Sequence, residues 1–277
     1  MRNLFFLLMI IVLAGCKKTE QVEAQPDIDS NEPAVTENPA PETPAEQPTD
    51  IFWQAIAEPQ DSHLKEKKSL WATYYKIHIA EHDPEGIPII GKENEPLGIS
   101  LGDRDWCEAA LEGTVGIQQD GKIIIYNYMD AKGPVQNDCK RYYSSLKANV
   151  LKGMSKTRFL PSSAAYGYGV KGWHLVPFRT IAVDKTVIPY GTVIYIPKAK
   201  GVEVELPSGS KVIHDGYFYA GDTGGAIKQQ HIDVFSGFYQ KNPFPEIVKS
   251  SEDQTFEAYI IENADVKTVL DSLHQNQ

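Results

Sequence analysis

Two stretches decide the fold of this chain: RTIAVDKTVIPYGTVIYIPKAKG at residues 179–201 and GYFYAGDTGGAIKQQHIDVF at residues 216–235. Both alternate β-branched or aromatic residues with turn-forming residues, which is typical of short strands. The same pattern occurs at residues 70–79, 122–129 and 255–261. No strand–helix–strand alternation accompanies it, so the sequence predicts a mainly β domain that closes into a barrel.

Helical insertions are expected between these strands. The segment at 51–70 predicts one or two short helices that pack Trp53 and its neighbours on the main body. Further helices are predicted around residues 105–111, 141–151 and 264–273.

Composition and charge limit the function. The chain has 277 residues, of which 42% are hydrophobic, so it can bury a sizeable core. Its formal net charge of -10 disfavours nucleic acid or an anionic membrane face as a partner, because either would need a basic patch. Neutral or cationic substrates remain open.

The first fifteen residues predict an export signal. The apolar run LFFLLMIIVLAG is too short to span a bilayer of ~30 Å as a helix. Ala14 and Gly15 directly before Cys16 resemble the bacterial lipobox, in which the cysteine is lipid-modified and becomes the first mature residue. Lys17 replaces the aspartate that often retains such lipoproteins in the inner membrane. We therefore expect a lipid anchor in the outer membrane, with the protein on its periplasmic face.

A linker follows the lipidated cysteine. Residues 16–50 are rich in Pro, Glu, Thr and Ala and contain little that could be buried, so we expect them to be disordered. The folded domain is then expected at residues 51–277.

The predicted export also indicates which chemistry to expect of the remaining cysteines. Cys107 and Cys139 remain as an even pair in an oxidising compartment, which predicts one disulfide worth ~3 kcal/mol. A catalytic thiol is not expected. Neither is a metal site or cofactor, because His174, His214 and His231 are isolated in sequence and no His-x-x-x-His pair occurs.

Three aspartates are the candidates for chemistry: Asp184, Asp222 and Asp233. Asp222 precedes a threonine and two glycines, which can adopt a positive φ and approach a ligand closely. Asp233 lies in an apolar strand, where lost hydration should bias it toward its protonated form. Two carboxyl groups in different surroundings are what cleavage of a glycosidic bond requires. From spacing alone, a structural role in capping turns or helices is favoured over a chemical one.

The motifs AVDKTVIPYGTVIYIP at 182–197 and AGDTGGAIKQQHIDVF at 220–235 resemble the three-aspartate domain of bacterial cell-wall lytic enzymes. The resemblance extends discontinuously over residues 71–262 and is dense at residues 180–237. It implies a six-stranded double-psi β-barrel, as in the membrane-bound lytic transglycosylase A group and in expansins. It also implies lytic cleavage of peptidoglycan glycan strands.

The resemblance assigns a role to each aspartate. It implies that Asp233 is the acid/base, that Asp222 orients or tunes it, and that Asp184 is structural or contacts substrate. The expected glycan-holding residues are Thr73, Tyr75, Thr223, Gly224 and Gly225. Asp233 would protonate the oxygen between N-acetylmuramic acid and N-acetylglucosamine, and would then take the proton of the muramyl C6 hydroxyl. The product would carry a 1,6-anhydromuramyl end.

A long insertion separates the opening strand from the first aspartate motif. We expect it at about residues 76–179, where it can reshape the groove. Its aromatic residues either line a sugar groove or pack in the interior: Tyr142, Tyr143, Tyr166, Tyr168 and Trp173. His174 and His231 are expected to hydrogen-bond or pack.

Two other functions remain open. A glycoside hydrolase on the same barrel would use Asp222 or another carboxylate to activate water. An expansin-like module would bind cell-wall glycan without turnover.

Overall fold

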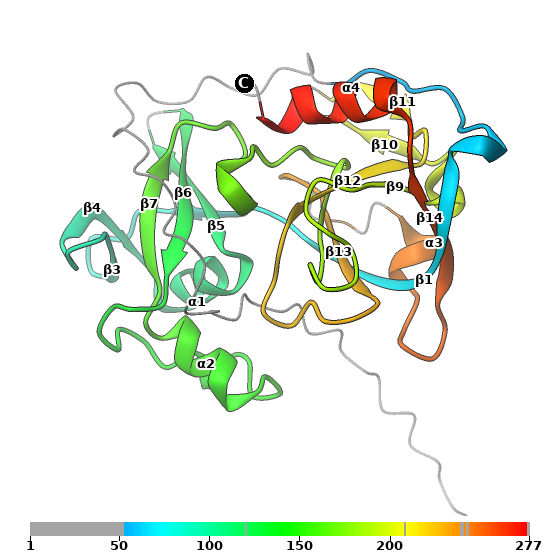
Figure 1. The fold of residues 1–277 in the computed structure, drawn as a ribbon. Coiled ribbons are helices and arrows are strands. Elements are labelled where there is room, and N and C mark those ends of the chain that lie inside the picture. The colour runs from blue at the N-terminus through cyan, green and yellow to red at the C-terminus, as the bar shows by residue number, and fades with distance from the viewer. Residues whose placement is uncertain (1–52, 120, 208, 239–240, 242–243, 276–277) are drawn as a thin grey trace, which may run out of the picture.

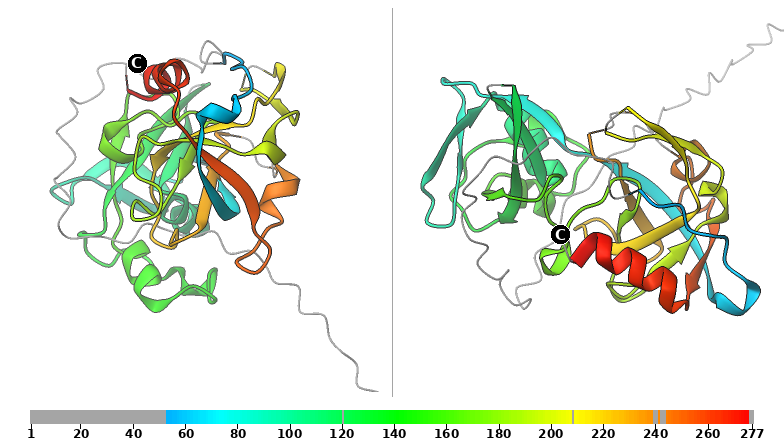
Figure 2. Two further views of the ribbon diagram at one scale, coloured as in Figure 1. Left: turned by 45° about the vertical axis from the view of Figure 1, so that its right-hand side comes forward. Right: turned by 90° about the horizontal axis from the view of Figure 1, so that it is seen from above.

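The computed structural model describes residues 53–119, 121–207, 209–238, 241 and 244–275. The chain forms two neighbouring β lobes, seen side by side from above in Figure 2. Within the described ranges, no helix is long and apolar enough to cross a bilayer. The predicted export signal, the predicted lipidation site at Cys16 and the predicted linker up to residue 50 lie outside these ranges.

The first lobe is a closed barrel of six strands in the order β1-β13-β8-β12-β9-β14 (Figure 1). The pairs β1·β13 and β8·β12 are parallel, and the other neighbours are antiparallel. The prediction of a mainly β chain with a closed six-stranded barrel and helical insertions is confirmed. The strands are β1 (Leu64–Tyr75), β8 (Thr180–Ala182), β9 (Val193–Tyr195), β12 (Tyr217–Asp222), β13 (His231–Phe235) and β14 (Phe256–Ile261).

Alternation along the strands fills the barrel. Ala72 on β1, Ile181 on β8, Phe218 on β12 and Ile232 on β13 are buried in one hydrophobic cluster. Because side chains alternate between the two faces of a strand, their direct neighbours lie on the other face. That other face carries the aspartates of the sequence motifs.

The second lobe is built from the long insertion. Its sheet has the order β2-β5-β6-β7, beside the hairpin β3-β4. The disulfide between Cys107 and Cys139 closes a segment of this lobe. Its elements are β2 (His78–Glu81), β3 (Ile87–Ile90), β4 (Pro96–Leu101), α1 (Asp103–Glu112), β5 (Thr114–Gln119), β6 (Lys122–Asp130), α2 (Ala148–Met154) and β7 (Arg158–Ser162).

Four smaller elements complete the barrel lobe. The hairpin β10·β11 follows β9, and α4 packs on the barrel through Val266 and Leu270 (Figure 1). The bounds are β10 (Glu203–Glu205), β11 (Lys211–Ile213), α3 (Pro245–Val248) and α4 (Ala264–Gln275).

Two helix predictions need correction. The helices expected at 51–70 are wrong, because the first described element there is a single 3-10 turn at Asp61–His63 and β1 follows it. The charged first half of β1 pairs with β14, far away in sequence, and no local pattern reveals that partner. The helix expected at 141–151 is confirmed only at its end, since α2 begins at Ala148.

Candidate active site

The outward faces of β1 and β13 form a ladder of three residue pairs. Trp71 lies opposite His231, and Thr73 lies opposite Asp233. The rings of the first pair are stacked with centroids 3.6 Å apart. Thr73 Oγ1 lies 2.9 Å from Asp233 Oδ1, within hydrogen-bond distance. In the third pair Tyr75 packs its ring on Phe235, so the ladder continues toward the second lobe.

A β-bulge brings Asp222 to the same face. Along β12, Ala220 pairs with Ile181, and the next pair joins Asp222 to Ala182. The residue skipped in this register turns Asp222 onto the face of Ala182 rather than into the core. Asp233 also pairs with Ala182, from the other side of β8. The two aspartates therefore stand on strands that flank one alanine.

Tyr75 binds one of the two carboxyl groups and lies within the electrostatic influence of the other. Its hydroxyl donates a hydrogen bond of 2.6 Å to Asp222 Oδ2. Burial and the charge of Asp222 raise the pKa of Tyr75 well above its usual value. The carboxylates of Asp233 and Glu112 contribute in the same direction. The phenol therefore keeps its proton and serves as a permanent donor.

Asp222 binds protons more tightly than an ordinary aspartate. Loss of hydration raises its pKa from 3.8 to about 6, although the hydrogen bond from Tyr75 acts in the opposite direction. Part of the residue remains exposed. Asp222 can therefore exchange a proton near neutral pH at the edge of the site.

Asp233 lies deeper, with 3% of its surface exposed. His231, two residues earlier on the same face, contacts the same hydroxyl: its Nε2 lies 2.8 Å from Thr73 Oγ1. Burial lowers the pKa of His231 to about 4, although the Ala226 carbonyl acts in the opposite direction. The ring is therefore neutral at neutral pH.

Asp184 holds a turn rather than joining the pair. Its Oδ1 accepts hydrogen bonds from the amide and hydroxyl of Thr186, and its Oδ2 accepts one of 2.9 Å from the amide of Gln229. Burial opposes its ionisation, but these hydrogen bonds lower the pKa of Asp184 below its ordinary value. It fastens the loop between the second and third aspartates to the end of β8.

The residues after Asp222 differ in part from expectation. Thr223 directs its hydroxyl at the carbonyl of Val183, 3.4 Å away. Gly224 does not use the positive φ that a glycine allows. A Cβ there would lie 2.6 Å from Cγ1 of Ile227, so this glycine makes room for a packed side chain. Gly225 is buried.

A glycine-rich segment crosses directly over Asp222. A Cβ on Gly169 would lie 2.3 Å from the carbonyl oxygen of Gly221 and 3.3 Å from Cβ of Asp222. The sequence left open whether the aromatic residues of this segment line a groove or pack, and it did not reveal that Gly169 permits close backbone packing. The repeated Gly-x-Gly in YGYGVKG was the available signal.

The aromatic residues of the insertion have separate positions. Tyr166 is buried and packs on Phe238. Tyr168 shares a hydrogen bond with Ser163, and Trp173 packs on Tyr219. Tyr142 donates its hydroxyl to Asp103, and Tyr143 packs against the core of the second lobe.

Sequence reasoning also missed Glu112, at the end of α1. Its side chain is 1% exposed and its Oε2 accepts a hydrogen bond of 3.2 Å from the amide of Lys76, directly after β1. It therefore brings a carboxyl from the second lobe to the neighbourhood of Tyr75. No local pattern signals this contact, because the two residues are 36 positions apart.

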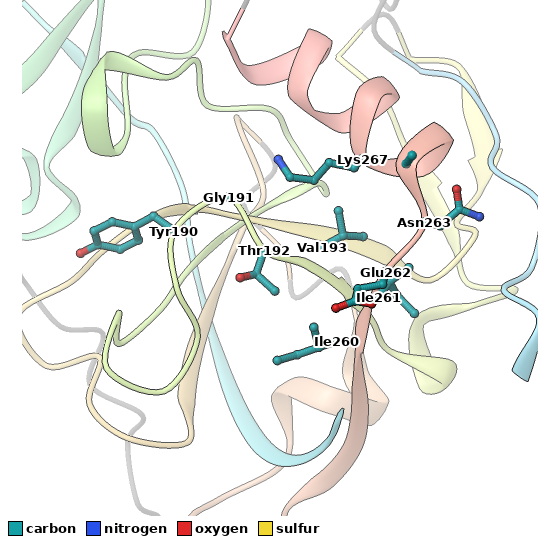
Figure 3. A pocket seen from close by; sticks show the side chains of 10 residues that line it. Tyr190, Gly191, Thr192, Val193, Ile260, Ile261, Glu262, Asn263 and Lys267 are labelled. Atoms are coloured by element: carbon teal, nitrogen blue, oxygen red, sulfur yellow. The ribbon is translucent and has the colours of Figure 1, made fainter. Parts of the chain in front are cut away.

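A cavity of about 550 Å³ lies where β9, β14 and α4 meet, as Figure 3 shows. Its lining residue Gly191 donates a hydrogen bond to the carbonyl of Ala220, so its wall adjoins the strand that bears Asp222. The lining includes neither Asp222 nor Asp233. Within the part of the chain that the structure describes, no three His, Cys, Asp or Glu side chains are grouped to hold a metal ion.

Comparison with known proteins identifies a domain family and a related enzyme with similar sequence. Residues 179–242 match the model of the 3D domain. Membrane-bound lytic murein transglycosylase A of Vibrio cholerae serotype O1 is 34% identical over 83 residues, which are 28% of this chain and 21% of the Vibrio protein. The matched region thus spans about a fifth of that relative's length.

Solved structures of similar proteins were also found. The crystal structure of E. coli MltA with bound chitohexaose is 18% identical and covers 71% of this chain and 72% of its own, with a TM-score of 0.48. A membrane-bound lytic murein transglycosylase from Agrobacterium tumefaciens is 13% identical, covers 72% and 76%, and has a TM-score of 0.43. Through residues 179–242 this chain carries a 3D domain, and it resembles the lytic transglycosylases of the MltA type.

Proposed function

We propose that this protein is a lytic transglycosylase that cleaves peptidoglycan glycan strands. The bond broken is the β-1,4 link between N-acetylmuramic acid and N-acetylglucosamine, and the product carries a 1,6-anhydromuramyl end. One observation carries the proposal: the pairing of Asp222 and Asp233 with the same residue, Ala182, inside the segment that matches the 3D domain.

In this proposal Asp233 is the acid/base. It donates its proton to the glycosidic oxygen as the bond to C1 breaks, and the resulting carboxylate then takes the proton of the C6 hydroxyl that closes onto C1. Because the attacking hydroxyl belongs to the same sugar, correct positioning supplies much of the acceleration. The burial of Asp233 supports the acid role, since a dry carboxyl favours its neutral form.

The neighbouring donors have different tasks. The hydroxyls of Thr73 and Tyr75 are directed at the two carboxyls, so we assign them to orienting the acid pair rather than to holding sugar. The chain around Thr223, Gly224 and Gly225 follows the partly exposed Asp222 and is our candidate for contacting the glycan. Asp184 holds the end of that loop in place by accepting a hydrogen bond from the amide of Gln229.

The proposed location follows from the N-terminal sequence. Lipidation of Cys16 would anchor the protein in the outer membrane, and the linker at 17–50 would let the periplasmic domain reach the cell wall. The relative from Vibrio is named as membrane-bound, which agrees with an anchored protein.

The decisive experiment is digestion of purified sacculi in heavy-oxygen water, with mass spectrometry of the fragments. We expect anhydromuramyl ends without heavy oxygen, and loss of at least a hundredfold in rate for Asp233→Asn. Asp253→Asn, on an exposed residue shortly before β14, controls for the lost charge and should keep full activity. Reducing ends that carry heavy oxygen would instead establish hydrolysis.

The structure also gives the hydrolase alternative a specific base. Asp222 is partly exposed and has a pKa of about 6, so its carboxylate could activate a water molecule. In that case Asp222→Asn would abolish release of labelled fragments. Binding to sacculi without any released fragment would indicate the expansin-like module.

A further inference from the structure

The hydroxyl of Thr73 lies between two acceptors. It is 2.9 Å from Asp233 Oδ1 and 2.8 Å from His231 Nε2, and all three residues are buried. A threonine hydroxyl has a single proton, so it can donate to only one of them at a time. Which one receives it depends on the tautomer of the histidine.

The surroundings of His231 select that tautomer. Its Nδ1 lies 3.3 Å from the carbonyl oxygen of Ala226, which can only accept. A proton on Nδ1 satisfies this contact, whereas a proton on Nε2 would set two lone pairs against each other. The ring stacks on Trp71 with an angle of 4° between the planes, which fixes its orientation. Nε2 is then an acceptor aimed at Thr73.

We propose that His231 is a positioning residue for the acid: by accepting the hydroxyl proton of Thr73, it withholds that hydrogen bond from the Asp233 carboxylate and so favours protonated Asp233. The inference rests on the proposed role of Asp233 and adds a device that keeps its proton in place. When Asp233 is protonated, the chain runs from Asp233 to Thr73 to His231 to Ala226, with each donor satisfied.

Proton transfer reverses one link of this chain. When Asp233 has given its proton to the glycosidic oxygen, rotation about the Thr73 C–O bond turns the hydroxyl from His231 to the new carboxylate. Apart from the O–H bond of Asp233, which breaks as the proton leaves, only hydrogen bonds change within the protein. When the carboxylate takes the C6 proton, the hydroxyl turns back. Protonated Asp233 is thus favoured at rest. The ionised carboxylate receives a hydrogen bond from Thr73 once the proton has been transferred.

Other titratable groups face Asp233 and must be separated from this effect. Among the described groups, Tyr75 on β1 interacts electrostatically with Asp233 and with Glu112 on α1. Asp222 on β12 is hydrogen-bonded to Tyr75. The strand β8 between the aspartates carries no titratable residue from Thr180 to Ala182. Since burial lowers the pKa of His231 to about 4, its own charge does not change across neutral pH.

The test is an NMR titration of isotope-labelled aspartate carboxyl carbons in the full chain, with signals assigned through Asp233→Asn and Asp222→Asn. His231→Phe keeps a ring against Trp71 but removes the acceptor. We expect the Asp233 titration midpoint to fall by about one pH unit, because Thr73 is then free to donate to the carboxylate. His231→Gln restores an acceptor near the Nε2 position and should return most of the shift, whereas His231→Asn, which reaches only the Nδ1 position, should not.

A double-mutant cycle checks the route through Thr73. In the Thr73→Val background, His231→Phe should leave the Asp233 midpoint unchanged, because the connecting hydroxyl is absent. A purely structural role for His231 would lower the melting temperature without moving this midpoint, and that result in both His231→Phe and His231→Asn would overturn the proposal.

The readout does not depend on activity. If the NMR midpoint moves and the alkaline limb of the pH–rate profile moves with it, both the positioning role and the acid assignment stand. If the midpoint moves and the rate profile does not, the hydrogen-bond chain stands, and Asp233 is not the acid of the reaction.

Discussion

At the scale of single residues, one skipped position determines which face of the barrel wall carries Asp222. Two-residue alternation from Ala220 would direct Asp222 into the barrel core, and the bulge at Gly221 directs it to the face of Asp233 instead. The motif indicated that the aspartates matter. It did not reveal the bulge, because a bulge is a property of the pairing with β8 and not of β12 alone.

Asp222 should make stability depend on pH. Its pKa in the folded protein, about 6, is above the ordinary 3.8, so the folded state favours the protonated form. The resulting stabilisation is complete below pH 4 and is lost as the pH rises through 6. Asp222→Asn removes this titration, so its melting temperature relative to the parent should increase between pH 4 and pH 8.

The measurement is thermal unfolding of both proteins at several pH values. Asp253→Asn, which removes an exposed carboxyl, serves as the control. A melting-temperature difference for Asp222→Asn that is constant with pH would show that Asp222 titrates alike in the folded and unfolded chain. The proposed catalytic function explains why such a costly group is present.

At the scale of elements, a strand was predicted correctly when its own residues, rather than its partner strand, determined its structure. Regular alternation in β12 and β13 predicted both strands from their own residues. The first half of β1, LKEKKSL, carries the composition of an exposed helix and becomes a strand only through β14. Pairing over such a distance overrides local propensity.

The same holds for the candidate site: its residues could be picked out from the sequence, but the contacts between them could not. The sequence motif identified Asp222 and Asp233, and the resemblance added Thr73 and Tyr75. His231 was expected to hydrogen-bond or pack, which the structure bears out, but its link to Asp233 through Thr73 depends on the parallel pairing of β1 with β13. That register is a tertiary property.

The segment over Asp222 offers a test at this scale. Gly169→Ala would place a methyl group against the backbone of Gly221, which cannot move without shifting Asp222. We expect a loss of stability of about 1–3 kcal/mol, typical of overpacking, together with reduced activity. Denaturant unfolding and turnover on sacculi measure the two effects.

Gly153→Ala is the matched control for this prediction. Gly153 lies in α2, and a Cβ there would meet no atom within 4 Å. Alanine should therefore stabilise that helix by roughly 0.5–1 kcal/mol. If both substitutions had the same small effect, the segment over Asp222 would be free to move away, and the close packing would not constrain the site.

At the scale of the whole molecule, each lobe has its own hydrophobic core, and the lobes meet at an interface that we call the seam. Ile125, Tyr166 and Glu112 contribute to it from the second lobe. Trp106 and Phe159 belong to the core of the second lobe. Ile125 and Tyr166, also from the insertion, pack instead into the cluster of the barrel. Glu112 adds a polar contact to the start of the connection at Lys76. We therefore expect that the second lobe can loosen internally without displacing the strands of the barrel.

The disulfide provides the means to test that separation. Cys107 and Cys139 are 32 positions apart and both are buried in the second lobe. Replacing both by alanine should lower the free energy of unfolding by about 3 kcal/mol, because the unfolded chain regains the freedom of the closed loop. Hydrogen exchange should then rise in peptides from α1 and β5, while peptides from β13 keep their protection. Activity at room temperature should persist, because the aspartates lie on the barrel. Equal loss of protection in β13 would mean that the seam couples the lobes into one cooperative unit, and the site would then depend on the integrity of the insertion as much as on the barrel.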